Sequence, residues 1–258
     1  MDVYTFPMQT ISAVLAGEIR HLRLPDPDEE VMQEIRWGAF DQFFTPAYWA
    51  SQLWMLSDDP EALTYRLGTT LKEETAACML GGHGIIAEMC FAAYDALRER
   101  GLLAKNMVTQ EEIASALKEK LIYENRTFRY RFPNKKAAFL APALNMLSNE
   151  APPEDSHSSF RNWFLRFAGV GLKTASWITR NWLNSADVAI LDIHVVRGGR
   201  LCGLFGRGQD PTRHYFPMEA LFLDFAHRIK ADAAKLDVLM WQQMRTASSI
   251  GLACLVVD

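Results

Sequence analysis

Residues 160–183 read FRNWFLRFAGVGLKTASWITRNWL, and this stretch decides the fold. Two segments with helical periodicity meet at Gly169, Val170 and Gly171, which leaves space only for a tight turn between them. The backbone N–H groups at the start of the second helix have no partner within that helix, and the helix dipole favours an anion beside them. The stretch therefore predicts a helical hairpin whose turn holds a phosphate without a charged side chain.

Lys173 lies in the first turn of the second hairpin helix. A cation is unfavourable at the positive end of a helix dipole, so this position favours the free amine, which is the nucleophilic form. Asp192 follows nineteen residues later (192 − 173 = 19), in AILDIHVVR. We expect Asp192 to cap the helix that begins near Ile193 and to act as the electrostatic or acid–base partner of Lys173. Taken singly, the two residues have ordinary alternatives, a solvated lysine and a simple N-cap.

Helical periodicity also dominates the rest of the chain. Thr70–Glu73 and Thr109–Glu112 fit capping boxes, Gly101 is placed to end a helix, and Ser158 is expected to cap another. The run DVAILDIHVV is the best strand candidate, but it is also short enough to be a buried loop that enters a helix. The chain is therefore predicted to be nearly all-α, with one break near residues 150–157.

The composition is that of an ordinary folded protein, with 49% hydrophobic and 22% charged residues in a chain of 258. No apolar run is long enough to span a bilayer, and the N-terminal residues lack a secretory pattern. We therefore expect a cytoplasmic protein with no membrane partner. The cysteines Cys78, Cys90, Cys202 and Cys254 are scattered, which argues against zinc and iron–sulfur sites and predicts no metal.

The net charge of −4 counts mildly against a nucleic-acid partner, because phosphate contacts favour basic proteins. The charges are unevenly distributed, however. Between residues 121 and 140 the only acid is Glu124, and the cations are Arg126, Arg129, Arg131, Lys135 and Lys136. This distribution favours a local basic face that contacts DNA, with a merely solvated face as the alternative.

These features resemble the helix-hairpin-helix DNA glycosylase superfamily, and within it the archaeal-type 8-oxoguanine DNA glycosylase/AP lyases. The resemblance rests on GVGLKTAS, on AILDIH at the spacing this family shows between its lysine and aspartate, and on RYRFPNKKAAFL upstream. It covers roughly residues 120–245, whereas the first hundred residues match only as a generic helical lobe. It implies an all-α, two-lobed fold with the active site in the cleft between the lobes.

By this resemblance, residues 1–258 form a single glycosylase domain. The N-terminal lobe would span about 1–150 with a contribution from the C-terminal helix, and the hairpin lobe about 151–258. The partner would be double-stranded DNA with a damaged or modified base, bound by a monomer. No cofactor is expected, although the hairpin carbonyls leave room for a cation, as in relatives.

The resemblance also implies the reaction, which is the excision of oxidised guanine by a bifunctional glycosylase/lyase of base excision repair. Lys173 would attack C1′ of the damaged nucleotide and displace the base, and the resulting Schiff base would allow strand cleavage by β-elimination. Asp192 would stabilise the positive charge that develops on the sugar.

The target base must leave the duplex stack, so a pocket with a planar side chain is expected. The predicted pocket residues are Trp177 and Asn181, which follow Lys173 along its helix, and Trp241 and Gln242 in the last helix. For the two tryptophans, core packing is an equal alternative. The predicted DNA contacts are Gly169, Val170, Gly171, His194, Arg197, Arg129, Arg131 and Lys135.

Two segments depart from the archaeal-type pattern. That group carries a lysine shortly after its final helix, whereas this chain runs on through SSIGLACLVVD, and the N-terminal lobe matches poorly. Two alternatives therefore stay open. The first is the same lysine chemistry on another modified base, including phage-type modified DNA. The second is a catalytically silent helix-hairpin-helix DNA-binding protein, against which the presence of both Lys173 and Asp192 speaks.

Overall fold

The structure is a computed structural model, and it describes residues 8–57, 65–82 and 84–249. The chain divides into two compact units. The hairpin unit is Arg66–Ser185, and the terminal unit combines Met1–Tyr65 with Ala186–Asp258. The boundaries differ from the expected one near residue 150, because the Pro- and Ser-rich segment there is a loop inside the hairpin unit. The C-terminal helix does join the N-terminal residues, as expected.

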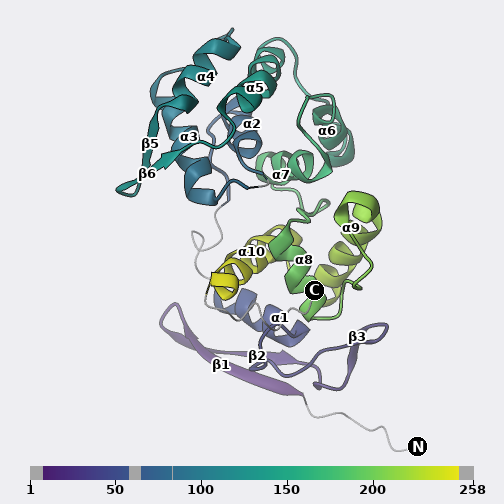
Figure 1. Cartoon of the computed structure of the whole chain (residues 1–258). Coiled ribbons are helices and arrows are strands. Elements are labelled where there is room, and N and C mark those ends of the chain that lie inside the picture. Colours follow the sequence, from purple (N-terminus) through teal and green to yellow (C-terminus); the bar gives the residue numbers. More distant parts are fainter. Residues whose placement is uncertain (1–7, 58–64, 83, 250–258) are drawn as a thin grey trace, which may run out of the picture. The chain divides into compact units, whose positions relative to one another are not determined.

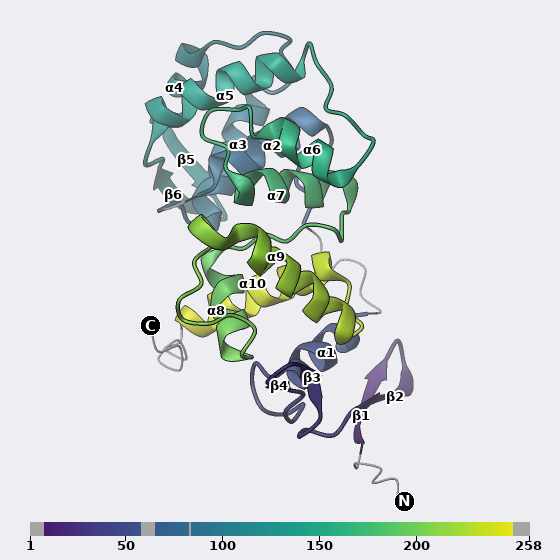
Figure 2. The same cartoon turned by 90° about the vertical axis from the view of Figure 1, so that its right-hand side faces the viewer.

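The hairpin unit is a group of helices with one β-hairpin (Figures 1 and 2). Its elements are α2 (Leu71–Leu80), α3 (Ala87–Glu99), α4 (Gln110–Lys118), β5 (Lys120–Tyr123), β6 (Arg126–Arg129), α5 (Pro133–Leu147), α6 (His157–Phe164) and α7 (Leu172–Leu183). Their apolar faces share one core, in which Leu140, Phe160 and Ile178 are fully buried. Helix α7 packs against α2 and α6, so the hairpin is anchored on both sides.

Local capping explains where these helices begin and end. Thr109 and Glu112 form the predicted capping box of α4. Thr70 caps α2, but the Glu73 carboxylate accepts from the neighbouring Thr69 instead, so that box is one-sided. Helix α6 is capped by Ser156, whose hydroxyl accepts from Ser159 N at 3.1 Å, and the prediction of Ser158 as the cap was wrong by two residues.

The terminal unit contains the remaining described elements. They are β1 (Gln9–Leu15), β2 (Glu18–Leu24), β3 (Glu30–Met32), β4 (Ile35–Arg36), α1 (Pro46–Met55), α8 (Ile193–Leu201), α9 (Pro211–Arg228) and α10 (Ala233–Ser249). Helix α10 packs against α1, α8 and α9, and Trp49 is fully buried in this core. The close approach of α8 to α10 requires Gly198, because a Cβ there would lie 2.6 Å from Cε of Met240.

Three antiparallel hairpins, β1–β2, β3–β4 and β5–β6, were not predicted from the sequence. Ala16 and Gly17 join β1 to β2 and have positive φ angles of 48° and 83°, as a type I′ turn requires. Glu124 and Asn125 do the same for β5 and β6. Neither pair is the Asn-Gly or Asp-Gly signal of such turns, which explains the omission. The strand candidate at residues 187–196 forms no strand, and α8 begins within it.

The described elements are nevertheless mostly helical, and the all-α class is confirmed. No helix in the described ranges is long and apolar enough to cross a membrane.

Candidate active site

The turn between α6 and α7 is shaped by two glycines that play different parts. Gly169 has φ +81°, and a Cβ on it would lie 2.3 Å from the ring of Phe139 in α5, so both conformation and packing require glycine. Val170 is buried beside it. Gly171 is exposed, has extended backbone and has open space where a Cβ would be. The turn is therefore held from one side and open to solvent at Gly171.

The N-terminus of α7 presents unused backbone donors. No side chain caps it, and the N–H groups of Leu172, Lys173 and Thr174 donate to no acceptor in the described part of the chain. The first satisfied amide is that of Ala175, which donates to Gly171 O at 2.9 Å. Free amides at the positive end of a helix dipole form a seat for a phosphate group.

Replacement of Gly169 by alanine should destabilise the hairpin unit, because the left-handed backbone costs roughly 1–2 kcal/mol for a residue with a Cβ and Phe139 must also move. Replacement of Gly171 by alanine is the matched control, with an expected change of about 0.5 kcal/mol or less. Urea unfolding of both variants measures the difference. Equal losses in the two variants would contradict the assigned turn geometry.

Lys173 is half-buried, and its amine forms no hydrogen bond or ion pair with the residues that the structure describes. Its charged neighbour is another lysine, Lys136 of α5, whose ammonium donates to Gly81 O at 2.6 Å and to Met79 O at the end of α2. Burial lowers the pKa of Lys136, Cys90 opposes this shift, and the charge of Lys173 adds to it. An unpaired, half-buried amine is better suited to act as a nucleophile than an amine that is held in a surface ion pair.

Trp177 lies one turn after Lys173 and is half-buried. Its ring packs partly on the core of the hairpin unit and partly against the backbone at Gly81, where a Cβ would lie 3.0 Å from Cζ3 of the ring. Core packing and an accessible ring are thus both present at this position. Stacking on a base stays a prediction.

Asn181 is only 1% exposed and belongs to a buried polar network. Its amide donates to Glu74 Oε1, and its oxygen accepts from Arg180 Nε at 2.9 Å. The other oxygen of the buried Glu74 carboxylate accepts from the backbone N–H groups of Leu67 at 2.8 Å and Gly68 at 2.7 Å. The network ties α7 to α2, so the structure gives Asn181 a scaffolding role in place of the predicted base contact.

The basic residues Arg129, Arg131 and Lys135 are all exposed, on β6 and around the start of α5. The Lys135 ammonium lies 5.9 Å from the Phe139 ring, which in turn packs on Gly169, so this cation and the hairpin turn belong to one surface. Phe132 is 37% exposed among these cations and was not singled out from the sequence. The signal for it is a phenylalanine inside the basic run RYRFPNKK.

In the terminal unit, Asp192 caps α8 as predicted. Its Oδ1 accepts from His194 N at 2.8 Å and from Val195 N at 2.9 Å. Its Oδ2 accepts no hydrogen bond from any residue in the described ranges, and the side chain is half-buried. One oxygen therefore caps the helix, while the other forms no hydrogen bond with the described residues.

His194 and Trp241 lie edge to face, with ring centroids 6.4 Å apart. Burial lowers the pKa of His194, Asp192 opposes this shift, and Arg197 and Arg245 add to it. The Nδ1 atom of His194 is buried without a hydrogen-bond partner in the part of the chain described. This environment favours a neutral imidazole, which makes His194 a weaker phosphate contact than the sequence suggested.

The last helix carries Trp241 and Gln242, both half-buried. The Arg245 guanidinium lies 4.8 Å from the centroid of the Trp241 ring, which is a cation–π distance. The predicted residues thus form two sets, one in each unit, and Lys173 and Asp192 belong to different sets. The segment SSIGLACLVVD spans residues 248–258, and from residue 250 onward it lies outside the described residues.

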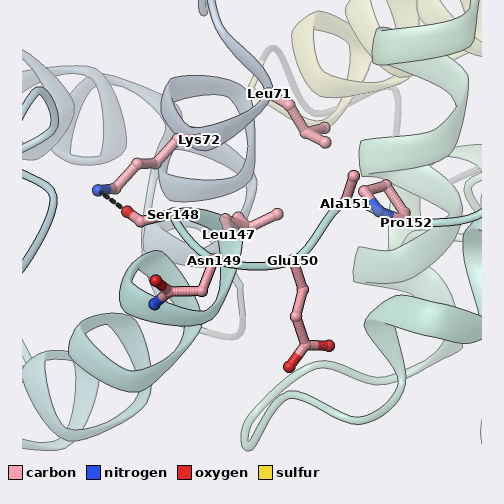
Figure 3. Close-up of a pocket in the computed structure, with 8 residues that line it drawn as sticks. All are labelled: Leu71, Lys72, Leu147, Ser148, Asn149, Glu150, Ala151 and Pro152. Carbon is pink, nitrogen blue, oxygen red and sulfur yellow. Dashed lines mark hydrogen bonds between the residues drawn. The ribbon is translucent and has the colours of Figure 1, made fainter.

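A pocket of about 320 Å³ lies elsewhere in the hairpin unit (Figure 3). It is lined by Leu71, Lys72, Leu147, Ser148, Asn149, Glu150, Ala151 and Pro152. Lys72 donates to Ser148 Oγ at 2.8 Å on its wall. None of the predicted site residues lines this pocket. Within the described ranges, no cluster of His, Cys, Asp or Glu side chains could hold a metal ion.

Comparisons with known proteins point to the same chemistry. A family model described as 8-oxoguanine DNA glycosylase matches residues 69–231, more than half of the chain. The crystal structure of the 8-oxoguanine DNA glycosylase of Methanocaldococcus jannaschii is 23% identical, with a TM-score of 0.54 over 69% of this chain and 78% of that one. The structure of the 8-oxoguanine glycosylase/lyase of the same organism, in complex with a 15mer DNA containing 8-oxoguanine, is 19% identical. Its TM-score is 0.56, and the match covers 76% of this chain and 97% of that one. Both likenesses support the helix-hairpin-helix fold.

Proposed function

The chain belongs to the 8-oxoguanine DNA glycosylase family, and from this premise we propose that it is a bifunctional glycosylase/AP lyase that excises 8-oxoguanine from duplex DNA. The observation that carries the proposal is the environment of the Lys173 amine. Its amine is half-buried and unpaired among the described residues, in the first turn of a helix whose free amides suit a phosphate. A protein that only binds DNA needs neither this amine nor Asp192, so the presence of both speaks against a catalytically silent binder.

In the proposed reaction, the Lys173 amine attacks C1′ of the damaged nucleotide and loses a proton as the C–N bond forms. The glycosidic bond breaks, and the base leaves with the electron pair and takes up a proton. Opening of the sugar ring gives the Schiff base, and removal of a proton from C2′ then expels the 3′ phosphate. Asp192 stabilises the positive charge on the sugar through Oδ2, because Oδ1 is held by α8.

The proposed DNA contacts follow the surface of the hairpin unit. The amides at the start of α7 hold one phosphate, and Arg129 and Lys135 add sequence-independent attraction. The exposed ring of Phe132 can enter the space that a flipped nucleotide leaves, as apolar wedges do. Trp177 offers a planar face for the extruded base.

Borohydride trapping with the unmodified protein tests the proposal. The substrates are duplexes that carry 8-oxoguanine, other modified bases or a preformed abasic site. We expect a covalent adduct and 3′-side cleavage with 8-oxoguanine and with the abasic site. EDTA should not change the yield, because none of the proposed steps uses a metal ion.

Each other outcome selects an alternative. Adducts with the abasic site and another base, but not with 8-oxoguanine, keep the lysine chemistry and overturn the substrate. DNA binding with no adduct on any duplex overturns the lyase proposal and leaves the silent DNA-binding protein.

A further inference from the structure

The N-terminal ribbon, β1 with β2, lies outside the residues that the family model matches. It is a regular antiparallel pair (Figures 1 and 2). In its register, Leu15 faces Glu18 and Gln9 faces Leu24. An isolated two-stranded sheet is marginally stable and leaves both of its edges open. The residues at its tip, Val14 and Ile19, are each 71% exposed. The ribbon therefore has strand edges at which a further strand could pair.

The register decides which backbone groups are unused. The type I′ turn at Ala16 and Gly17 makes Leu15 and Glu18 a hydrogen-bonded pair, and such pairs alternate along the ribbon. The N–H and C=O groups of the intervening β1 residues, Thr10, Ser12 and Val14, then point away from β2. These groups form no hydrogen bond with any described residue. The outer edge of β1 is thus a row of free donors and acceptors.

The two edges of the ribbon differ in how they are protected. Natural proteins block exposed edges with charges, prolines or bulges. Strand β2 carries Glu18, Arg20 and Arg23, whereas β1 reads QTISAVL and has no charge, no proline and no irregularity in register. The outer edge of β1 is therefore the unprotected edge, and it is the one available for pairing with another strand.

We propose that the outer edge of β1 pairs with β1 of a second copy of this chain, in antiparallel orientation, to form a four-stranded sheet across a two-fold axis. The strand is self-complementary in one register centred on Ser12. Ser12 then faces Ser12 of the other copy, and Thr10 faces Val14, so all of the outward groups are used. This arrangement replaces the expected monomer by a dimer.

The charges favour the pairing of β1 with β1 of a second copy over the other possible strand pairings. Two β1 strands bring no like charges onto adjacent strands, whereas two paired β2 strands would place His21 opposite His21 and put the arginines of both copies on adjacent strands. Pairing of β1 with β2 of another copy would leave new open edges and build chains of increasing length. The symmetric pair closes on itself.

Sedimentation velocity over a range of concentrations tests the proposal on the full chain. The mass of the unmodified protein should rise from that of one chain, 29.3 kDa, toward twice that value. Ser12→Pro should stay at the mass of one chain, because proline removes an outward N–H that is not used between β1 and β2. Ser12→Ala is the matched control, because it loses the same 2.8 Å contact with His21 but keeps the amide and should still dimerise.

Cysteine cross-linking tests the register independently of whether the proline variant keeps its ribbon. Ser12→Cys should form a disulfide-linked dimer, because facing Cα atoms in such a pair lie roughly 5.5 Å apart. Thr10→Cys mixed with Val14→Cys should cross-link, whereas neither alone should, and Arg23→Cys on β2 is the negative control. A one-chain mass at every concentration, masses that grow beyond two chains, or equal cross-linking of Arg23→Cys would each overturn the proposal.

Discussion

Replacement of Lys173 by glutamine should abolish the borohydride-trapped adduct and leave the fold intact. Glutamine has a similar stem but no amine, so no Schiff base can form. The native amine has no hydrogen bond or ion pair with the described residues, so little stability is lost with it. Single-turnover cleavage should fall by roughly a thousandfold or more, as with other nucleophile deletions. Gel analysis of the trapped complex and thermal unfolding measure the two effects.

Lys135→Gln is the matched control, because it makes the same change of charge on an exposed lysine of the same unit. It should keep the adduct and weaken DNA binding only in proportion to one lost phosphate contact, with a shallower dependence on salt. Peptide mapping of the native adduct adds a second check. An adduct that persists in Lys173→Gln and maps to Lys136 would assign the nucleophile to that neighbouring amine instead.

The features that were predictable from the sequence are those encoded within a few residues. The hairpin turn, the Thr109 capping box, the helix end at Gly101 and the Asp192 cap each depend on one residue and its near neighbours. These signals act within one turn of a helix, so no knowledge of the tertiary structure is needed to read them. The family resemblance, which rests on the same local motifs, is confirmed by the match over residues 69–231.

The features that were missed depend on contacts between distant segments. Asn181 follows Lys173 at helical spacing, but its partner is Glu74, more than a hundred residues earlier (181 − 74 = 107). The unit boundaries likewise follow from the packing of α1 against α10, a contact between distant segments that no local composition records. The ribbon at residues 9–24 was missed for a different reason, because Ala-Gly is an unusual pair in a type I′ turn.

Replacement of Asp192 by asparagine should separate the two tasks of this side chain. Asparagine is as good an N-cap as aspartate, so its oxygen can still accept from His194 N and Val195 N. The cost in stability is the lost charge at the helix N-terminus, about 0.3–1 kcal/mol. The excision step should slow by about a hundredfold to a thousandfold, because a neutral amide does not stabilise a cationic sugar.

Asp210→Asn is the matched control for this experiment. Asp210 caps α9, with Oδ1 accepting from Thr212 N at 2.9 Å, and it is half-buried, as Asp192 is. The same substitution there should cost a similar small amount of stability and leave excision unchanged. Asp192→Ala, which also removes the cap, should lose about 1 kcal/mol more. Two outcomes would contradict the charge-stabilising role. The first is that Asp192→Asn slows excision no more than Asp210→Asn does, and the second is that it loses the fold and DNA binding together. In either case the carboxylate acts only as the cap of α8.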